Sequence, residues 1–475
     1  MANNVIVHNN SLVNLVRGLA ERVYNVESRW GFHPPPKPRS GAYGVLSEFA
    51  NLLVDACGSS TRITYEQFVG MYTGRKASIY QKAVDSLAAR PVRKSDSFLS
   101  TFVKAEKVVP SSAKPDPAPR VIQPRNTRYN TELGRFLKPL ETRICKGITA
   151  LWGGVTCVVM KGLTVEGVAH ALRAKWDTFR RPVAIGLDAS RFDQHVSIDA
   201  LRWEHSVYAR MFHGSDRDCL ERLLSWQLRN RGFARTATGM VEYYVNGCRM
   251  SGDMNTGMGN CLIMCALVYT YAKLRGVKVE LANNGDDCVV ILESCDEARF
   301  SKGLSEWFLT MGFTMKVEAP VRVFEQIEFC RMHPVWAGDA WVMVRNPLDA
   351  IKRDCTTILS LPNLSAVRKW WYVVGAGGLS ITGGVPIFQR MYSVMKGAGE
   401  VSDMAYDPWL SETGFMRLRS HRHYNQVTPE ARYSFWLAFG ITPDAQEAFE
   451  NAFSLDCIWA PGECPLAGHT WDTIL

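Results

Sequence analysis

Three features that would place the chain in a common class are absent from its 475 residues. No apolar run reaches the roughly 20 residues that a membrane-spanning helix needs, and the most apolar stretch, CLIMCALVYTYA at 261–272, predicts a buried helix instead. The thirteen cysteines include no C-x-x-C pair and no signal peptide opens the chain, which predicts reduced thiols in the cytosol. The absence of a GxxxxGK[ST] sequence excludes a P-loop helicase or ATPase.

The composition is that of an ordinary folded protein with an excess of positive charge. Hydrophobic residues make up 47% and charged residues 21% of the chain, which is long enough for two or three subdomains. The formal net charge of +9 favours a polyanionic partner, although such a charge also serves solubility alone.

Much of this positive charge lies between residues 93 and 128. Only Asp96, Glu106 and Asp116 oppose the basic residues there, which are Arg93, Lys94, Lys104, Lys107, Lys114, Arg120, Arg125 and Arg128. Prolines at 110, 115, 117, 119 and 124 keep the segment irregular, so its cations project from loops and short strands. The segment is either a solvated loop or, in the interpretation we prefer, an arch that binds phosphate groups.

The pattern of apolar and polar residues predicts mixed α and β structure. Helices are expected over 164–179, 198–212 and 257–274, and a mainly helical region after about residue 340. A short buried strand is expected over 182–188, and hairpins are expected over 241–253 and 277–293. The strand ends on Asp188, and the turn of the last hairpin carries Asp286 and Asp287.

Asp188, Asp286 and Asp287 converge if their two elements are neighbours in one sheet. An Asp pair is also tolerated in a surface turn, and the D-x4-D spacing of Asp188 and Asp193 is common by chance. Three carboxylates close together repel one another unless a divalent cation neutralises them. Hard oxygen ligands favour Mg²⁺, for which Mn²⁺ can substitute. We therefore expect the three to bind two Mg²⁺ ions roughly 3.5–4 Å apart.

The segment SGDMNTGMGN at 251–260 supplies a third motif. It predicts a Ser-Gly turn that leads into a helix with Thr256 and Asn260 on one face. With Ser251 and Asp193 they offer hydroxyl, amide and carboxylate groups that can hydrogen-bond to a ribose. The alternative is structural: Ser251 and Asp193 cap the helices that follow them, and Asn260 is a satisfied buried amide.

The order of these motifs resembles a known family. LDASRFDQHVS, SGDMNTGMGN and NNGDD are similar to motifs A, B and C of viral RNA-dependent RNA polymerases, in particular those of the tombusvirus and carmovirus family of plus-strand plant viruses. FVKAEKV (102–108) and PAPRVIQPR (117–125) are similar to motif F, GFTMKVE (312–318) to motif D and IEFC (327–330) to motif E. The resemblance covers about residues 60–335 and is only general beyond them.

This resemblance implies an α+β right-hand polymerase fold with fingers, a palm built on an antiparallel sheet with helices, and a mainly helical thumb. The fingers, with an N-terminal extension, are expected over 1–156, and a fingers insertion over 196–250. The palm is expected over 157–195, which holds motif A, and over 251–340, which holds motifs B to E. The thumb is expected over 341–475.

The resemblance also implies a role for each candidate residue. Asp188 and Asp286 are expected to be the principal metal ligands and Asp287 an accessory one. The expected ribose-sensing set is Asp193, Ser251, Thr256 and Asn260. The residues expected to line the nucleotide channel and bind triphosphate are Lys104, Lys107, Arg120 and Arg125. Lys316 is expected to protonate pyrophosphate, and Phe329 and Cys330 to belong to the strand that supports the nascent 3′ end.

The function implied is replication of a plus-strand viral RNA genome by magnesium-dependent transfer of nucleotides from NTPs to an RNA 3′-OH. The expected partners are template and product RNA, NTPs and a membrane-anchored viral replication protein, of which polymerases of this family are usually a readthrough extension. The expected location is the host cytoplasm, at membrane-bound replication sites. A reverse transcriptase and a non-catalytic RNA-binding scaffold stay open as alternatives.

Aromatic residues are dense toward the C-terminus. One of Trp336, Trp341 and Tyr406 is a candidate platform that stacks on an initiating nucleotide in place of a primer. Packing in a hydrophobic core is the alternative for each of them.

Overall fold

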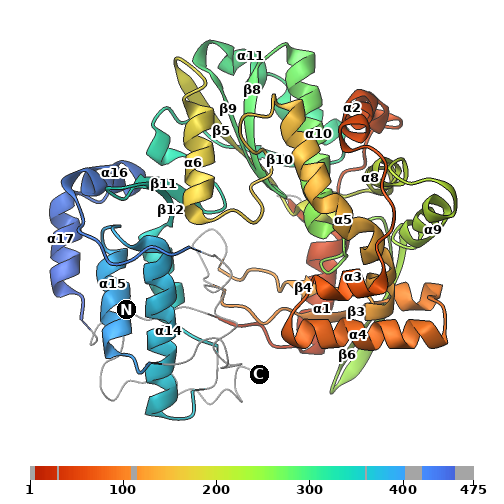
Figure 1. Cartoon of the computed structure of the whole chain (residues 1–475), viewed down its shortest axis with the longest axis horizontal. Helices are drawn as coiled ribbons and strands as arrows, with labels where there is room; N and C mark the ends of the chain where they lie inside the picture. The colour runs from red at the N-terminus through yellow and green to blue at the C-terminus, as the bar shows by residue number, and fades with distance from the viewer. Residues whose placement is uncertain (1–5, 29–30, 109–114, 359–360, 402–419, 455–475) are drawn as a thin grey trace.

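The structure, a computed structural model, describes residues 6–28, 31–108, 115–358, 361–401 and 420–454. A central sheet lies at the top of the view in Figure 1, with helices packed against it. The last helices of the chain lie on one side below this sheet, and strands from the first half of the chain lie on the other. The expected α+β class is confirmed.

The central sheet has four antiparallel strands in the order β10-β5-β9-β8. They are β5 (Pro182–Ala189), β8 (Val279–Asn284), β9 (Asp287–Glu293) and β10 (Met315–Val317). Alternate residues of β9 enter different cores, with Val290 and Leu292 in one and Val289 and Ile291 in the other, so both faces of the sheet are covered. The predicted strand at 182–188 and the hairpin at 277–293 are confirmed.

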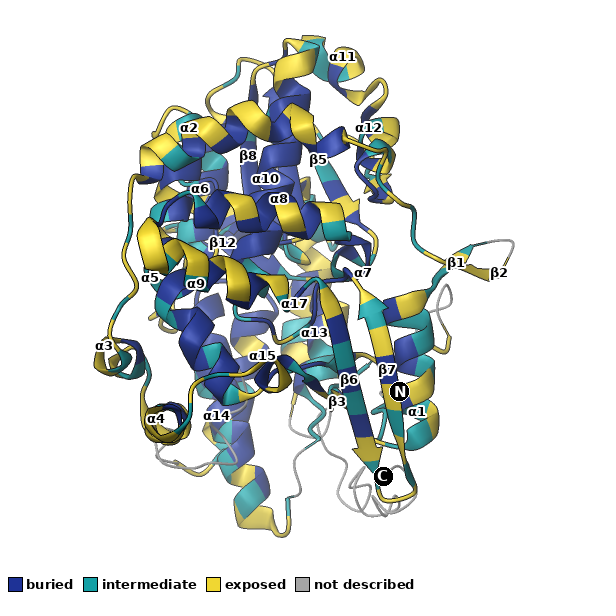
Figure 2. Cartoon of the chain, turned by 90° about the vertical axis from the view of Figure 1, so that its right-hand side faces the viewer, coloured by how far each residue is buried: buried dark blue, intermediate teal, exposed yellow. Residues whose placement is uncertain are grey.

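Helices on the two faces explain why the surrounding segments are apolar. Helix α6 (Val165–Trp176) packs on one face, and α10 (Thr256–Arg275) on the other (Figure 1). Every residue of α10 between 258 and 268 is buried, because α2 (Ser47–Cys57), α5 (Thr127–Leu151) and α8 (Ile198–Ala209) cover its remaining sides (Figure 2). The three helices predicted from sequence periodicity are confirmed. Among the described residues, no helix has the length and hydropathy to cross a bilayer.

A second sheet has the order β4-β3-β6-β7 and is antiparallel except between β3 and β6. Its strands are β3 (Leu99–Val103), β4 (Val121–Ile122), β6 (Arg229–Thr236) and β7 (Gly239–Asn246), and one face packs on α1 (Leu12–Leu19). The hairpin expected over 241–253 is wrong in its bounds. Residues 241–246 are a strand, but its partner lies upstream at 229–236, where outward-facing arginines hide the apolar alternation. Residues 247–253 form a turn region.

The other elements before residue 330 surround the two sheets or connect their strands. They are the π-helix η1 (Ala20–Tyr24), β1 (Val26–Ser28), β2 (Gly31–His33), η2 (Ala42–Leu46), α3 (Tyr65–Gly70), α4 (Gly74–Ala89), η3 (Lys94–Ser97), α7 (Phe192–His195), α9 (Gly214–Ser225), η4 (Ser294–Asp296), α11 (Glu297–Ser301), α12 (Leu304–Thr310) and η5 (Phe324–Gln326).

The C-terminal region begins with a hairpin and continues in helices, which agrees with the predicted helical region after 340. The hairpin consists of β11 (Met332–Trp336) and β12 (Trp341–Arg345), followed by α13 (Pro347–Asp354), α14 (Leu364–Thr382), α15 (Phe388–Ala398), α16 (Pro429–Phe439) and α17 (Pro443–Ala452). Helices α14 and α15 approach closely because Gly378 has no side chain: a Cβ there would lie 2.3 Å from the Tyr392 ring.

Candidate active site

Asp188 and Asp287 lie directly opposite each other at one end of the central sheet. They are register partners in the antiparallel pair β5–β9, and Asp286 lies in the turn just before β9. Side chains opposite each other in such a pair have Cβ atoms about 4.5–5.5 Å apart. The sheet therefore brings together the three aspartates that the sequence placed in separate motifs.

Hydrogen bonds to Gly285 hold the turn that carries Asp286 in place. Gly285 has φ +84°, a left-handed conformation that favours glycine. Its backbone N–H donates to Sγ of Cys261 at 3.1 Å, and its carbonyl accepts from Nδ2 of Asn283 at 2.8 Å. Cys261, which the sequence presents only as a core residue of α10, thus also anchors the acidic turn.

Burial and neighbouring negative charge raise the pKa of two of the aspartates, Asp286 and Asp287. Restricted hydration is the largest cause and, together with the charges of Asp286 and Asp188, raises the pKa of Asp287 to about 6. The pKa of Asp286 is raised by the same loss of hydration and by Asp188, while the positive charge of Arg120 opposes the shift. A cluster that raises its own pKa in this way attracts a cation.

The donor set fits a divalent cation, because all three groups are hard oxygen ligands. In the part of the chain that the structure describes, no three His, Cys, Asp or Glu side chains are gathered closely enough to hold a metal ion as they stand. Binding would therefore require the carboxylates to rotate toward a shared point from fixed backbone positions.

Asp193 and Asn260 form a second part of the site. Asp193 lies in the four-residue helix α7, and its Oδ1 accepts a 2.7 Å hydrogen bond from Nδ2 of Asn260 on α10. Burial raises the pKa of Asp193, and the bond from Asn260 opposes the shift. The charge of Asp286 also raises it, which places the pair beside the acidic cluster.

The other two residues of the expected ribose set are placed differently. The Thr256 hydroxyl donates to the carbonyl oxygens of Met250 and Asp253, both at 3.0 Å, and so closes the turn before α10. The carbonyl of Ser251 accepts from the N–H of Gln123 at 2.7 Å, which ties this turn to β4. The Thr256 hydroxyl is thus used within this turn, whereas the sequence led us to expect that it contacts the sugar.

A buried ion pair beneath Asn260 was missed from the sequence. The guanidinium of Arg249 is bonded to the carboxylate of Glu204, and neither side chain is exposed. Nε of Arg249 donates to Oδ1 of Asn260 at 3.1 Å, so the pair orients the amide that contacts Asp193. A Cβ at Gly259 would lie 2.3 Å from Glu204 Oε1, which accounts for a glycine at that position.

The N-terminal segment holds the loop that carries Asp193, and this too was missed. Backbone carbonyls of the π-helix η1 and of Asn25 accept from the side chain of Arg191, and Asn25 also accepts from Nε2 of Gln194 at 2.7 Å. Arg191 has φ +49°, a strained conformation for a residue with a side chain. The segment at 20–25 thus fixes the residues on both sides of Asp193.

Comparison with known proteins decides the family. Residues 2–456 match the profile of the family described as "Viral RNA dependent RNA polymerase". This chain belongs to that family. It is 47% identical over 461 residues to the RNA-directed RNA polymerase of tobacco necrosis virus strain D, with 94% of this chain and 62% of that protein aligned. The corresponding protein of melon necrotic spot virus is 46% identical over 463 residues, with 95% and 57% aligned.

The family assignment agrees with the resemblance drawn from motifs A, B and C. The protein of turnip crinkle virus, also an RNA-directed RNA polymerase, is 45% identical over 470 residues and covers 96% of this chain. A member of this family has the right-hand polymerase fold, and the observed mixture of antiparallel sheet and helices agrees with it. The chain spans about 57% to 62% of the length of these three relatives.

Of the four motif F cations, Arg120 and Lys104 are accessible. The side chain of Arg120 is 57% exposed, and its charge lies close enough to Asp286 to oppose the burial-driven rise in the pKa of that carboxyl. Lys104 is 41% exposed, and Glu106 lies between the two cations, 2.8 Å from Nζ of Lys104 and 3.5 Å from Nη1 of Arg120. Both cations are therefore free to contact solvent.

Lys107 and Arg125 do not lie in an open channel, which corrects the sequence expectation. Nζ of Lys107 donates to the carbonyl oxygens of Arg353 and Thr356, so it joins motif F to the end of α13. Arg125 is buried, with Nε 2.5 Å from Oδ1 of Asp253 and further bonds to Ser97 and Asn230. Its charge is already neutralised inside the protein, so it supports the turn of motif B.

The motif D and E residues flank the acidic cluster. Lys316 is the register partner of Asp188 on β10, and its side chain is 67% exposed. Phe329 forms an antiparallel β-bridge with Met332 of β11. Cys330 lies in the tight turn between them, where Cys330 and Arg331 have φ +53° and +60°. Sγ of Cys330 accepts from Nδ2 of Asn284 at 3.3 Å, so this turn packs beside the hairpin that carries Asp287.

The aromatic candidates pack within the protein. Trp336 and Trp341 are register partners in the β11–β12 hairpin with ring centroids 5.7 Å apart, and Trp341 also packs edge-to-face on Phe324. The guanidinium of Arg173 on α6 lies 5.6 Å from the Trp341 ring. These contacts favour the core alternative for both tryptophans. Tyr406 lies outside the described residues.

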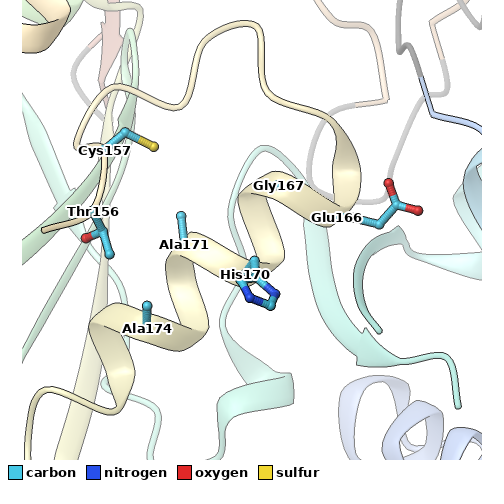
Figure 3. Close-up of a pocket in the computed structure, with 7 residues that line it drawn as sticks. All are labelled: Thr156, Cys157, Glu166, Gly167, His170, Ala171 and Ala174. Atoms are coloured by element: carbon cyan, nitrogen blue, oxygen red, sulfur yellow. The ribbon is translucent and has the colours of Figure 1, made fainter. Parts of the chain in front are cut away.

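A cavity of about 480 Å³ lies apart from the acidic cluster (Figure 3). It is lined by one side of α6, from Glu166 to Ala174, and by Thr156 and Cys157 of the preceding segment. The buried Lys175 donates to Oγ1 of Thr156 at 2.7 Å and so fixes one wall. None of the motif A, B or C residues lines this cavity.

Proposed function

We propose that this chain catalyses RNA-dependent RNA synthesis, transferring nucleotides from NTPs to an RNA 3′-OH on a plus-strand viral template. The observation that carries the proposal is the position of Asp188 and Asp287 side by side, next to the Asp193–Asn260 pair. One end of the central sheet thus presents groups for both the phosphates and the sugar of a nucleotide. The names of the relatives support the same reaction.

Asp188 and Asp286, with Asp287 as an accessory ligand, would hold two Mg²⁺ ions, and Mn²⁺ would substitute for them. When bound, these ions activate the 3′-hydroxyl and stabilise the pyrophosphate leaving group. The three carboxylates supply the negative charge that such ions require.

The remaining residues bind and orient the nucleotide. Arg120 and Lys104 contact the triphosphate, because they are the accessible cations of motif F near the carboxylates. Asp193 accepts a hydrogen bond from the ribose 2′-OH, and Asn260 keeps its carboxylate in place. Lys316 lies on β10, opposite Asp188 of β5, and donates a proton to the departing pyrophosphate.

We further propose which residues form the fingers, the palm and the thumb of the right-hand fold. Residues 1–156 and 196–250 form the fingers, which contain the second sheet, and residues 157–195 and 251–340 form the palm around the central sheet. Residues 341–475 form the thumb. The β11–β12 hairpin spans the boundary at 340 and connects palm and thumb.

Primer extension on a short RNA hairpin tests the function. We expect incorporation of NTPs with Mg²⁺ and none with EDTA, and Asp286→Asn should abolish incorporation while RNA binding stays near normal. Asp218→Asn, an exposed aspartate on α9, is the matched control and should retain activity. Wild-type incorporation by a folded Asp286→Asn protein would refute the assignment.

Two alternatives give different outcomes in the same assay. A reverse transcriptase would extend the primer with dNTPs, which the Asp193–Asn260 pair disfavours. A non-catalytic RNA-binding scaffold would bind RNA in a salt-dependent way without any incorporation. We further propose that the chain works in the host cytoplasm at membrane-bound replication sites, recruited by a membrane-anchored viral replication protein; the family resemblance is the basis for this.

A further inference from the structure

The two faces of the second sheet differ in composition. One face, with Leu99, Ala234 and Tyr243, is buried against Leu15 and Leu19 of α1. Along β6 and β7 the alternate residues point the other way and are exposed or half-buried (Figure 2). No described element covers this outer face, on which aromatic and basic residues predominate.

The outer face is built around Arg231. Its guanidinium carbon lies 5.2 Å from the ring centre of Phe98, 5.0 Å from that of Phe233 and 5.7 Å from that of Tyr244. Arg231 also forms a 2.7 Å ion pair with Glu242. These contacts fix the three rings in place, so the surface is formed in advance of any partner.

Several large apolar side chains of this face are exposed. Tyr244 is 61% exposed, Met240 54% and Phe102 43%. The face carries the exposed Arg229 and Arg235 besides Arg231, against one carboxylate, that of Glu242. A sheet face that only meets solvent has no need of clustered exposed aromatic rings, so this face marks an interaction site. Its excess of arginines over carboxylates favours a polyanionic partner.

We propose that this outer face binds single-stranded RNA at a site separate from the acidic cluster. Exposed aromatic rings on a four-stranded sheet stack on unpaired bases, and interleaved arginines contact the phosphates. The positive charge selects a polyanion, and the rings select one with unpaired bases. Because stacking is tolerant of base identity, the site should show little sequence preference.

The position of the face connects it to the polymerase site. The backbone N–H of Lys104, just after β3, donates to the carbonyl of Arg120, just before β4, at 2.8 Å. Strand β3 therefore ends just before Lys104, and β4 begins just after Arg120, so both strands lead to accessible cations of motif F. RNA on the outer face would pass along Phe102 toward these cations, which suits a single-stranded template or product near the site. Binding at the face itself does not depend on the proposed catalysis.

Fluorescence anisotropy with the full chain tests the site, using a labelled unstructured 20-nucleotide RNA and a blunt double-stranded RNA as probes. Tyr244→Ala and Phe102→Ala should each weaken single-strand binding about five- to a hundredfold, with little effect on the duplex. Tyr244→Phe keeps the ring and should bind like the wild type. The control is Tyr433→Ala, because Tyr433 on α16 is 56% exposed and lies off the sheet.

Charge substitutions give an independent measurement if an alanine variant folds poorly. Arg235→Ala should reduce the slope of log affinity against log salt by about 1, and Arg235→Glu should reduce affinity further. Unchanged RNA affinity in all of these variants would overturn the proposal. So would a wild-type dimer, seen by sedimentation velocity, that Tyr244→Ala converts to a monomer without change in RNA binding, because the face would then be a protein interface.

Discussion

The side-chain amide of Asn260 is held between two charged groups: its Nδ2 donates to Asp193 at 2.7 Å, and its Oδ1 accepts from Arg249 at 3.1 Å. Both polar atoms of the amide are therefore used, and its orientation is fixed by the bonds. Asp193 Oδ1 receives the amide proton, and the carboxylate keeps acceptor capacity for a sugar hydroxyl. Arg249 thus sets the position of the Asp193 carboxylate indirectly, through the Asn260 amide.

Asp193→Ala should reduce discrimination between ribose and deoxyribose. A dNTP leaves a buried acceptor unpaired, which costs about 1–3 kcal/mol. We expect the NTP-to-dNTP ratio of kcat/KM to narrow by at least about tenfold, with magnesium dependence retained. Loss of stability with an unchanged sugar ratio would instead mean that Asp193 has only a structural role.

Two arginines of motif F should behave in opposite ways on substitution. Arg120→Ala removes an exposed cation near Asp286, and should raise the KM for NTPs by the loss of a contact worth about 1.5–3 kcal/mol while stability is kept. Arg125→Ala leaves Asp253 buried without its partner, and should lower the free energy of unfolding by about 3–5 kcal/mol. Single-nucleotide incorporation and urea unfolding measure the two effects. If Arg120→Ala weakens only RNA affinity, motif F binds template and not triphosphate.

The sequence predicts the central sheet well because its signals are local. Alternation in 277–293 and the Asn-Asn-Gly-Asp turn are sufficient to place β8, β9 and the acidic turn. The pairing of β5 with β9 brings Asp188 opposite Asp287. Predicting it required only that two apolar strands be neighbours, one with an aspartate at its end and the other with an aspartate at its start. The long apolar segment of α10 likewise identifies a helix covered on all sides.

The contacts that support the site depend on residues far apart in the chain, and these could not be predicted. Arg125 pairs with a residue 128 positions away, and a count of basic residues does not separate a buried arginine from an exposed one. Glu204 and Arg249 lie 45 positions apart, in segments read as an ordinary helix and a hairpin. The bonds from Arg191 to carbonyls of residues 21 and 25 involve backbone atoms, for which side-chain identity carries no signal.

Stability should fall on acidification because of His205. Burial lowers the pKa of this histidine to about 4, and its Nε2 donates to Oε1 of Gln227 at 3.1 Å. The unfolded chain binds the proton near pH 6.5 and the folded chain only near pH 4, so the stabilisation is complete above 6.5 and is lost as pH falls between these values. The loss should reach at most about 3 kcal/mol.

His205→Gln should make the unfolding free energy depend less on pH between about 4 and 6.5. The buried His195 and the half-buried His333 also have lowered pKa values, so part of the dependence should remain. Urea unfolding at several pH values measures the slope for both proteins. Equal slopes would mean that His205 is protonated in the folded state as readily as in the unfolded chain.

Substitutions in the buried pair of Glu204 and Arg249 should affect protein stability and the selection of ribose over deoxyribose in different ways. Glu204 accepts further bonds from Asn255 at 2.7 Å and from the Tyr208 hydroxyl at 2.8 Å, so its charge is fully compensated. Glu204→Gln leaves the Arg249 cation without a counter-charge in a dry environment, and should lower the free energy of unfolding by about 3–5 kcal/mol. Urea unfolding measures this loss.

The double variant Glu204→Met with Arg249→Met removes both charges and fills similar volume. It should be more stable than either single variant, because no unpaired charge stays buried. It should nevertheless lose sugar selection, since Asn260 then has no Arg249 to orient it toward Asp193. We expect recovered urea stability together with a narrowed NTP-to-dNTP ratio in primer extension. A double variant with the wild-type sugar ratio would mean that Asp193 alone fixes Asn260, and that the ion pair serves only to hold α8 against the turn that precedes α10.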